Sequence, residues 1–256
     1  MPDRFLPGVP GPQVEAAFGS APGNEVESGK FDSPESSAAL AANALGYFLN
    51  RVQDLPPLPG CEAEIWPARS LALEATIRFP WRGGRHPVLD GLVATPSALI
   101  GIESKRYEPF RSKGKASLSD AYWRPCWGDH MGGYESLRDA LRADSRPYLQ
   151  LDATQLFKHA FGSRTDVHRD RPRKGLRPVL FYLYAEPEVW PTDGTPVDKG
   201  AKERHRREIR AFAAAVAGDE VIFVACSYKT LLGNWASSED AGIRAHAQLV
   251  LQRYSP

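Results

Sequence analysis

The chain has 256 residues, of which 42% are hydrophobic and 25% charged, proportions typical of a globular protein with a sizeable core. Its 32 basic and 31 acidic residues give a net charge of +1, which alone argues neither for nor against nucleic-acid binding, so any binding of a polyanion must come from local clusters of basic residues. The cysteines, Cys61, Cys126 and Cys226, are too far apart in sequence to predict a zinc-binding pair or a disulfide framework, and they favour a reducing compartment. We find no signal-peptide pattern and no apolar run of roughly 18 residues. We therefore expect a cytoplasmic protein without a membrane partner.

The first 33 residues are rich in proline, glycine, serine and acid and show no periodicity. This composition predicts that residues 1–33 form an extended or partly disordered lead-in to a single domain at residues 34–256. Ser33 and Pro34 are favourable residues for the cap and the first position of a helix. We expect that helix to continue through the alanine-rich residues 36–54.

Three short segments then predict a meander of strands. Residues 71–79 contain the apolar and β-branched residues typical of a strand, and Gly83-Gly84 provides a turn into residues 87–94. Pro96-Ser97 provides a second turn, into residues 98–105. Each strand contains an acidic residue, and pairing of neighbouring strands would bring these residues to one patch. The acidic residues are Glu74, Asp90 and Glu103.

Further elements complete an α/β pattern. We expect short helices at 135–143 and 153–161, a buried strand at 178–185, a basic amphipathic helix at 202–217, a buried strand at 221–227 and a closing helix at 241–254. The order helix, three strands, helix, strand, helix, strand argues for one α/β domain. The basic segment 164–177 is expected to be an exposed loop.

A long irregular segment at 111–133 separates the meander from the later elements, and loops of this length are more often functional than idle. Trp123 and Trp127 in this segment are typical either of buried packing, which we favour, or of stacking on bases.

Acidic oxygens at the meander would make a site suited to Mg²⁺ or Mn²⁺. Without a cation, crowded carboxylates repel one another and their pKa values rise. A bound cation offsets that repulsion, polarises a phosphoryl oxygen and lowers the pKa of a bound water. Lys105 lies two residues after Glu103, and a strand places residues two apart on the same face. Lys105 could therefore orient an attacking water or stabilise charge on the phosphorus.

Asp90 is followed, after 12 intervening residues (91–102), by Glu103-Ser104-Lys105. This pattern resembles the Asp…(Asp/Glu)-X-Lys signature of the PD-(D/E)XK nuclease superfamily, which includes type II restriction enzymes. The segments IESKRYEPF and DATQLFKHAFG look like a bacterial subgroup of that superfamily whose biological role is unassigned. Leu89 stands where the signature has proline, a departure at a position that is not a ligand.

The resemblance implies a restriction-endonuclease-like core, in which helices flank a central mixed sheet in the order α-β-β-β-α-β. It implies that Asp90 and Glu103 are metal ligands, that Lys105 is the catalytic lysine, and that Glu74 is a third acid. The backbone carbonyl of Ser104 would be a further ligand. The cofactor would be Mg²⁺ or Mn²⁺.

The resemblance also implies a nucleic-acid substrate, most readily DNA, cleaved in restriction, defence or repair. Gln155 and Lys158 lie on the helix after the motif, where some branches place a further active-site residue, so we expect them to contact substrate. His159 beside them is expected to lie on a solvated helix edge. The basic clusters at 164–177 and 202–210 would contact the phosphate backbone. Many enzymes of this type dimerise, which leaves a homodimer open.

Other interpretations remain open on the sequence alone. The three motif residues could be paired or solvated at strand ends, and Glu74 could pair with Arg78 or Arg82. The chain could be a catalytically inactive module that binds nucleic acid or a partner on the same fold. It could also hydrolyse another phosphate ester, such as a nucleotide or RNA.

Overall fold

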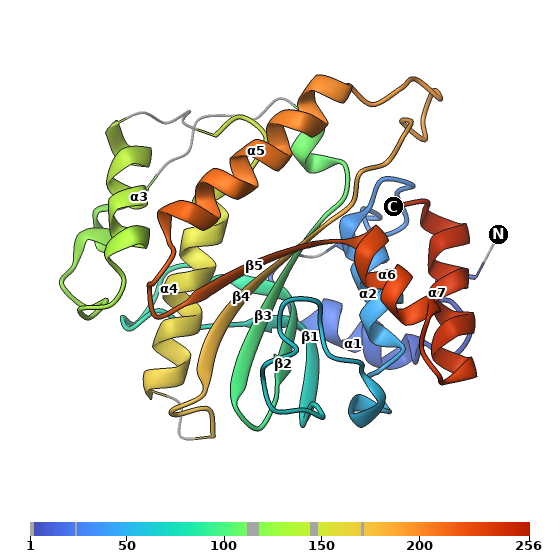
Figure 1. Cartoon of the computed structure of the whole chain (residues 1–256), viewed down its shortest axis with the longest axis horizontal. Helices are drawn as coiled ribbons and strands as arrows, with labels where there is room; N and C mark the ends of the chain where they lie inside the picture. Colours follow the sequence, from blue (N-terminus) through green and yellow to red (C-terminus); the bar gives the residue numbers. More distant parts are fainter. Residues whose placement is uncertain (1–2, 24, 112–117, 144–147, 170–171) are drawn as a thin grey trace.

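The computed structural model describes residues 3–23, 25–111, 118–143, 148–169 and 172–256 (Figure 1). The helices and strands of these residues, in chain order, are α1 (Gly11–Ser20), α2 (Ser37–Gly46), β1 (Ser70–Thr76), β2 (Val88–Ala94), β3 (Ala98–Lys105), α3 (Gly132–Ala143), α4 (Ala153–Arg169), β4 (Arg177–Tyr184), α5 (Lys199–Ala215), β5 (Ile222–Ser227), α6 (Tyr228–Ala236) and α7 (Ala241–Tyr254). Short 3₁₀ helices lie at η1 (Val52–Asp54), η2 (Glu108–Phe110) and η3 (Asp120–Trp123).

Within these residues the strands form one mixed sheet in the order β1-β2-β3-β4-β5. The first three strands are an antiparallel meander, and β4 and β5 continue it in parallel with β3. One face is covered by α1, α2 and α6, with α7 packed on α2 and α6, and the other face is covered by α4 and α5, with α3 packed on these two helices (Figure 1). The prediction of a mixed sheet flanked by helices is confirmed.

Strand β3 lies at the centre of the sheet, which explains its continuous apolar sequence. Ile100 and Ile102 enter the core on the α2 face, whereas Leu99 enters the core on the α4 face. A Cβ at Gly101 would lie 2.8 Å from Cδ1 of Leu89 and 3.3 Å from Oγ of Ser163, so glycine lets α4 approach the strand closely. A strand buried on both faces cannot show alternation of apolar and polar residues.

The expected lead-in at residues 1–33 is wrong for the described part of that segment. Residues 11–20 form α1, whose Val14 and Phe18 are buried in the same core as Phe31. The next helix also begins later than expected, because the side chain of Ser36 rather than that of Ser33 accepts the capping bond, from the backbone N–H of Ala39. Residues 1, 2 and 24 lie outside the described residues.

Helix α4 continues through Gly162 to Arg169 and does not end at Phe161. A Cβ at Gly162 would lie 2.6 Å from Cδ1 of Ile77, so this glycine serves close packing of α4 on the sheet and does not end the helix. The segment expected as a loop at 164–177 therefore begins as helix.

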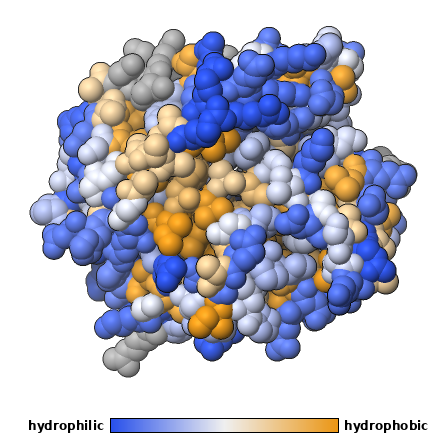
Figure 2. All heavy atoms as spheres, in the orientation of Figure 1, coloured by the Kyte–Doolittle hydropathy of each residue, from blue (hydrophilic) through white to orange (hydrophobic). Residues whose placement is uncertain are grey.

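The final strand is also less buried than its apolar sequence predicts. Strand β5 is an edge strand, and its Ile222 is 37% exposed. In the orientation of Figure 1, β5 crosses the front of the molecule, and Figure 2 shows apolar side chains gathered near the middle of this front face. The short helix α6 that follows was not predicted from the sequence.

The buried His246 of α7 makes the packing of α2 against α7 sensitive to acid. Its ring stacks on Tyr47 with centroids 4.1 Å apart, and its Nε2 lies 3.2 Å from the carbonyl oxygen of Ala44. Burial lowers the pKa of His246 to about 4. Between about pH 6.5 and pH 4, His246 therefore binds a proton in the unfolded chain but not in the folded chain.

We predict that the free energy of unfolding falls by on the order of 2 kcal/mol between pH 6.5 and pH 4 because of His246. The stabilisation is present above pH 6.5 and is lost as the pH falls toward 4. Urea denaturation across this range measures it, and His246→Phe should flatten the pH dependence while exposed His130→Gln should not. An equally steep dependence in the His246 variant would contradict the assignment.

Candidate active site

Strand β1 reverses its faces at Glu74. Leu73 packs in the core on the α2 face, whereas Ala75 packs in the core on the α4 face. A regular strand would place both on the same face. The backbone of Glu74 has a φ of +50°, in the left-handed region that non-glycine residues rarely occupy. Such a conformation costs on the order of 1–3 kcal/mol, so strain is stored at one of the predicted acids.

Strand β2 makes the same reversal at Asp90. Leu89 lies in the core beside α4, whereas a Cβ at Gly91 would lie 3.0 Å from Cδ1 of Leu45 in α2. The antiparallel register runs from Leu73–Gly91 to Ala75–Leu89, which places Glu74 opposite Asp90. The pairing of β2 with β3 ends at Gly91, so the two strands separate where Asp90 begins.

The side chain of Asp90 fills the fork between the separated strands. Its Oδ2 accepts a hydrogen bond of 2.6 Å from the backbone N–H of Ser104 in β3. The Ser104 side chain points to the opposite face, where its Oγ lies 2.7 Å from the hydroxyl of Tyr228. Glu103 and Lys105 therefore share the α4 face, as strand alternation predicts, and they form an ion pair. Asp90, Glu103 and Lys105 are thus brought together.

Glu103 is 1% exposed and has a cationic or proton-donating partner at each oxygen. Lys105 pairs with Oε1, and Nε2 of His159 in α4 lies 2.8 Å from Oε2. The expectation that His159 lies on a solvated helix edge is wrong. Helical spacing could have located it, because His159 shares a face with Leu156 and Ser163, which are both buried.

The pKa values of these residues are strongly displaced. Burial raises the pKa of Asp90, and the neighbouring Glu103 carboxylate raises it further. Burial also opposes ionisation of Glu103, but Lys105 and His159 outweigh it and lower the pKa of Glu103 to about 2. Burial disfavours the charged form of Lys105, but Glu103 and Asp90 reverse this and raise its pKa.

Glu74 completes the cluster as a weaker acid. Burial, together with repulsion from Glu25 and Glu103, raises the pKa of Glu74 to about 7. The alternative that Glu74 pairs with Arg78 or Arg82 finds no support among the described residues, where no ion pair joins them.

The donors of this cluster fit a hard divalent cation. Burial first, and then repulsion from neighbouring carboxylates, raises the pKa values of Glu74 and Asp90. A divalent ion would offset both effects. Among the described residues, no three histidine, cysteine or acidic side chains are already spaced to hold a metal. In this arrangement the two oxygens of Glu103 face Lys105 and His159.

Gln155 and Lys158 lie on the first turns of α4, four residues and one residue before His159. The backbone N–H of Gln155 donates to the Asp152 side chain, and Nζ of Lys158 lies 5.6 Å from the ring centroid of Tyr122. Burial lowers the pKa of Lys158. Their contact with substrate stays a prediction.

The long segment at 111–133 is described only in part, and its Lys113-Gly114-Lys115 stretch lies outside the described residues. The favoured packing role of Trp127 is confirmed, because its ring is buried and stacks on Phe161 with centroids 4.0 Å apart. Trp123 is partly exposed, and Cζ of Arg142 lies over the Trp123 ring, 4.3 Å from the ring centroid.

The strand order and the flanking helices define a restriction-endonuclease-like core. The model of a family described as "Restriction Endonuclease associating with ARP" matches residues 13–255, and the chain belongs to that family. No curated protein and no solved structure matches the chain. Among the described residues, no helix is long and apolar enough to cross a membrane.

We predict that Glu74→Gln stabilises the metal-free protein at pH 8 by on the order of 1 kcal/mol, after allowance for solvent screening, and has little effect at pH 5. The folded-state pKa of about 7 lies above the ordinary value of 4.5, so the stabilisation by the protonated form is lost as the pH rises through 7. Urea denaturation in EDTA at both pH values checks this, with exposed Glu27→Gln as the control. An equal gain at both pH values would argue against the shifted pKa.

Proposed function

We propose that this protein is a Mg²⁺- or Mn²⁺-dependent nuclease that hydrolyses phosphodiester bonds in DNA. The observation that carries the proposal is the convergence of Asp90, Glu103 and Lys105 from two separated strands into one largely buried cluster. The family, which is one of restriction endonucleases, supports the same class of chemistry.

In this proposal Asp90 and Glu103 hold the metal ion. Glu74 and the backbone carbonyl of Ser104 are proposed as further ligands. When bound, the ion would polarise a phosphoryl oxygen and lower the pKa of a water molecule. Asp90 is already oriented by its hydrogen bond from the backbone of Ser104, so its free oxygen is the one available to the ion.

Lys105 acts as a cation in this scheme. Glu103 and Asp90 raise its pKa, so the ammonium group keeps its proton at neutral pH and is not a general base. Its Nζ donates hydrogen bonds to the attacking water and stabilises negative charge that develops on the phosphoryl oxygens. Its side chain is 16% exposed, whereas that of Glu103 is 2% exposed.

Helix α5 offers the basic surface on which we propose that the DNA backbone lies. His205 anchors the helix near the end of β3, since its ring lies 5.8 Å from that of Phe110 and its Nε2 lies 2.8 Å from the hydroxyl of Tyr182. Arg204, Arg207 and Arg210 of the same helix are exposed, and hydrophilic side chains gather over α5 in Figure 2.

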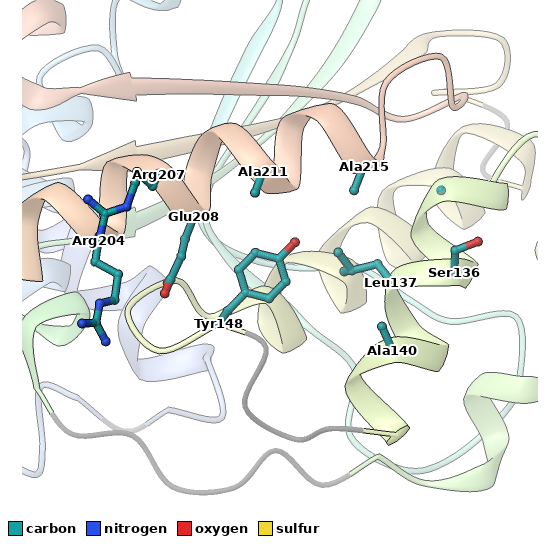
Figure 3. A pocket seen from close by; sticks show the side chains of 10 residues that line it. Ser136, Leu137, Ala140, Tyr148, Arg204, Arg207, Glu208, Ala211 and Ala215 are labelled. Carbon is teal, nitrogen blue, oxygen red and sulfur yellow. The ribbon is translucent and has the colours of Figure 1, made fainter.

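Arg204 and Arg207 border a groove of about 460 Å³ between α3 and α5. Figure 3 shows Arg204 and Arg207 at one end of this groove and Tyr148 at its middle. The groove does not include the acids of the cluster, so we propose it as part of the surface beside the site.

The basic segment 164–177 is a weaker candidate for DNA contact. Three of its arginines are already neutralised by acids, namely Arg164 by Glu220, Arg173 by Asp166 and Arg177 by Glu64. Within the expected cluster at 202–210, Lys202 is likewise buried and pairs with Glu188. The exposed arginines of α5 therefore carry the proposal.

We predict that Asp90→Asn and Lys105→Met each reduce DNA cleavage by at least about 100-fold, because one removes a metal ligand and the other removes charge stabilisation at the phosphoryl group. Supercoiled plasmid and single-stranded DNA, incubated with Mg²⁺, with Mn²⁺ or with EDTA, provide the assay. Asp193→Asn, at an exposed position, is the control, and circular dichroism checks that each variant folds.

Cleavage that survives both substitutions would overturn the proposal. DNA binding that is salt-sensitive, unaffected by metal and unaccompanied by cleavage would instead identify an inactive binding module. Cleavage of RNA or nucleotides alone would assign another phosphate ester as substrate.

We also predict that the double variant Arg204→Ala/Arg207→Ala binds DNA more weakly and with a salt dependence reduced by about two phosphate contacts. Fluorescence anisotropy at several salt concentrations, in EDTA to prevent cleavage, measures the slope of log K against log salt. Arg206→Ala is a matched control on the same helix, because Arg206 is already paired with Glu186. A slope unchanged in the double variant would remove α5 from the DNA-binding surface.

A further inference from the structure

The contact between Glu103 and His159 joins the central strand to the helix that crosses over it. Glu103 is 1% and His159 is 2% exposed, and their facing atoms lie 2.8 Å apart. A buried carboxylate without a partner is strongly destabilising, so the pair is a firm link between β3 and α4. No other side chain of α4 has a hydrogen bond or ion pair to Glu103 among the described residues.

The two oxygens of Glu103 have different surroundings. Oε1 is the oxygen that pairs with Lys105, whose charge also interacts with that of Asp90. Oε2 faces His159 and is held from the helix side. The imidazole therefore takes the oxygen that is farther from Lys105, and it leaves the other oxygen turned toward the cluster.

The histidine offers a single directed donor in this arrangement. Its Nε2 lies 2.8 Å from Oε2 of Glu103, whereas its buried Nδ1 has no ion-pair or hydrogen-bond partner within the described part of the chain. Any form of the ring that carries a proton on Nε2 can donate it to Oε2. Because Nε2 belongs to a rigid ring carried by α4, its position fixes how the Glu103 carboxylate group is rotated.

We propose that His159 is a positioning residue for the metal site, which holds Oε2 of Glu103 so that Oε1 is presented to the divalent ion beside Asp90. The inference rests on the proposed function, because it assigns to His159 a role in the same site. Groups that orient a ligating carboxylate typically change metal affinity by 10–100-fold when they are removed.

Two amide substitutions separate positioning from simple filling of the core. In His159→Gln the side-chain amide can place its nitrogen near the position of Nε2, so it can still donate to Oε2. In His159→Asn the amide nitrogen lies near the position of Nδ1 and cannot reach Glu103. The two variants have the same chemistry and similar size, and they differ in where the donor lies.

The test is the dissociation constant of Mn²⁺, measured by calorimetry on the full chain without DNA. We expect His159→Gln to bind Mn²⁺ within about threefold of wild type and His159→Asn to bind it 10–100-fold more weakly. Cleavage at saturating Mn²⁺ should be largely restored in His159→Asn, because the defect lies in binding the ion. Thermal unfolding in EDTA establishes that both variants fold.

Wild-type Mn²⁺ affinity in His159→Asn, or an equal loss in both variants, would overturn the positioning role and leave His159 as a core residue. Glu103→Gln tells this failure apart from failure of the proposed function. If Glu103→Gln binds Mn²⁺ as tightly as wild type, Glu103 is not a ligand, and the proposed metal site is overturned together with the role of His159.

Discussion

The structure depends on one buried charge, the carboxylate of Glu103 at the centre of the sheet. A carboxylate in this position is unfavourable unless charge and hydrogen-bond donors surround it. Lys105 supplies the charge from the same strand, and His159 supplies a donor from α4. The close approach of α4 that makes the second contact possible requires Gly101 beneath the helix. The packing of α4 against the sheet and the electrostatics of the site therefore depend on one another in this region.

A second constraint is the reversal of faces on β1 and β2. Both strands reverse their faces at opposite positions in the register, Glu74 on β1 and Asp90 on β2. The reversal ends the regular pairing with β3 and leaves a fork in which a side chain, rather than a backbone carbonyl, accepts the bond from Ser104. Strain at Glu74 and repulsion among the acids are unfavourable contributions that a folded core must offset. Proteins commonly tolerate such local violations where chemistry is carried out.

Sequence patterns predicted the strand meander, the face shared by Glu103 and Lys105, and the order of elements, because strand alternation and turn residues are local signals. They did not predict that Gly162 lies inside α4, since a glycine needed for close packing looks the same in sequence as one that ends a helix. The burial of His159 was also missed, because its partner is 56 residues away and on a strand. Helix α1 was missed because its buried apolar residues are few and their partners are distant in sequence, on the sheet and in the segment around Phe31.

The fork at Asp90 also divides the site between two parts of one sheet, which stay paired from Gly91 to Ala94. Asp90 belongs to the β1–β2 hairpin, whereas Glu103 and Lys105 belong to the block of β3, β4 and β5, in which α4 contacts β3 and β4. Any ligand that binds both carboxylates bridges the hairpin and the block. The binding of such a ligand is then thermodynamically linked to the contact between the hairpin and the block. Occupancy of the site would therefore stabilise the sheet beyond Gly91, where the hydrogen bonds between β2 and β3 end.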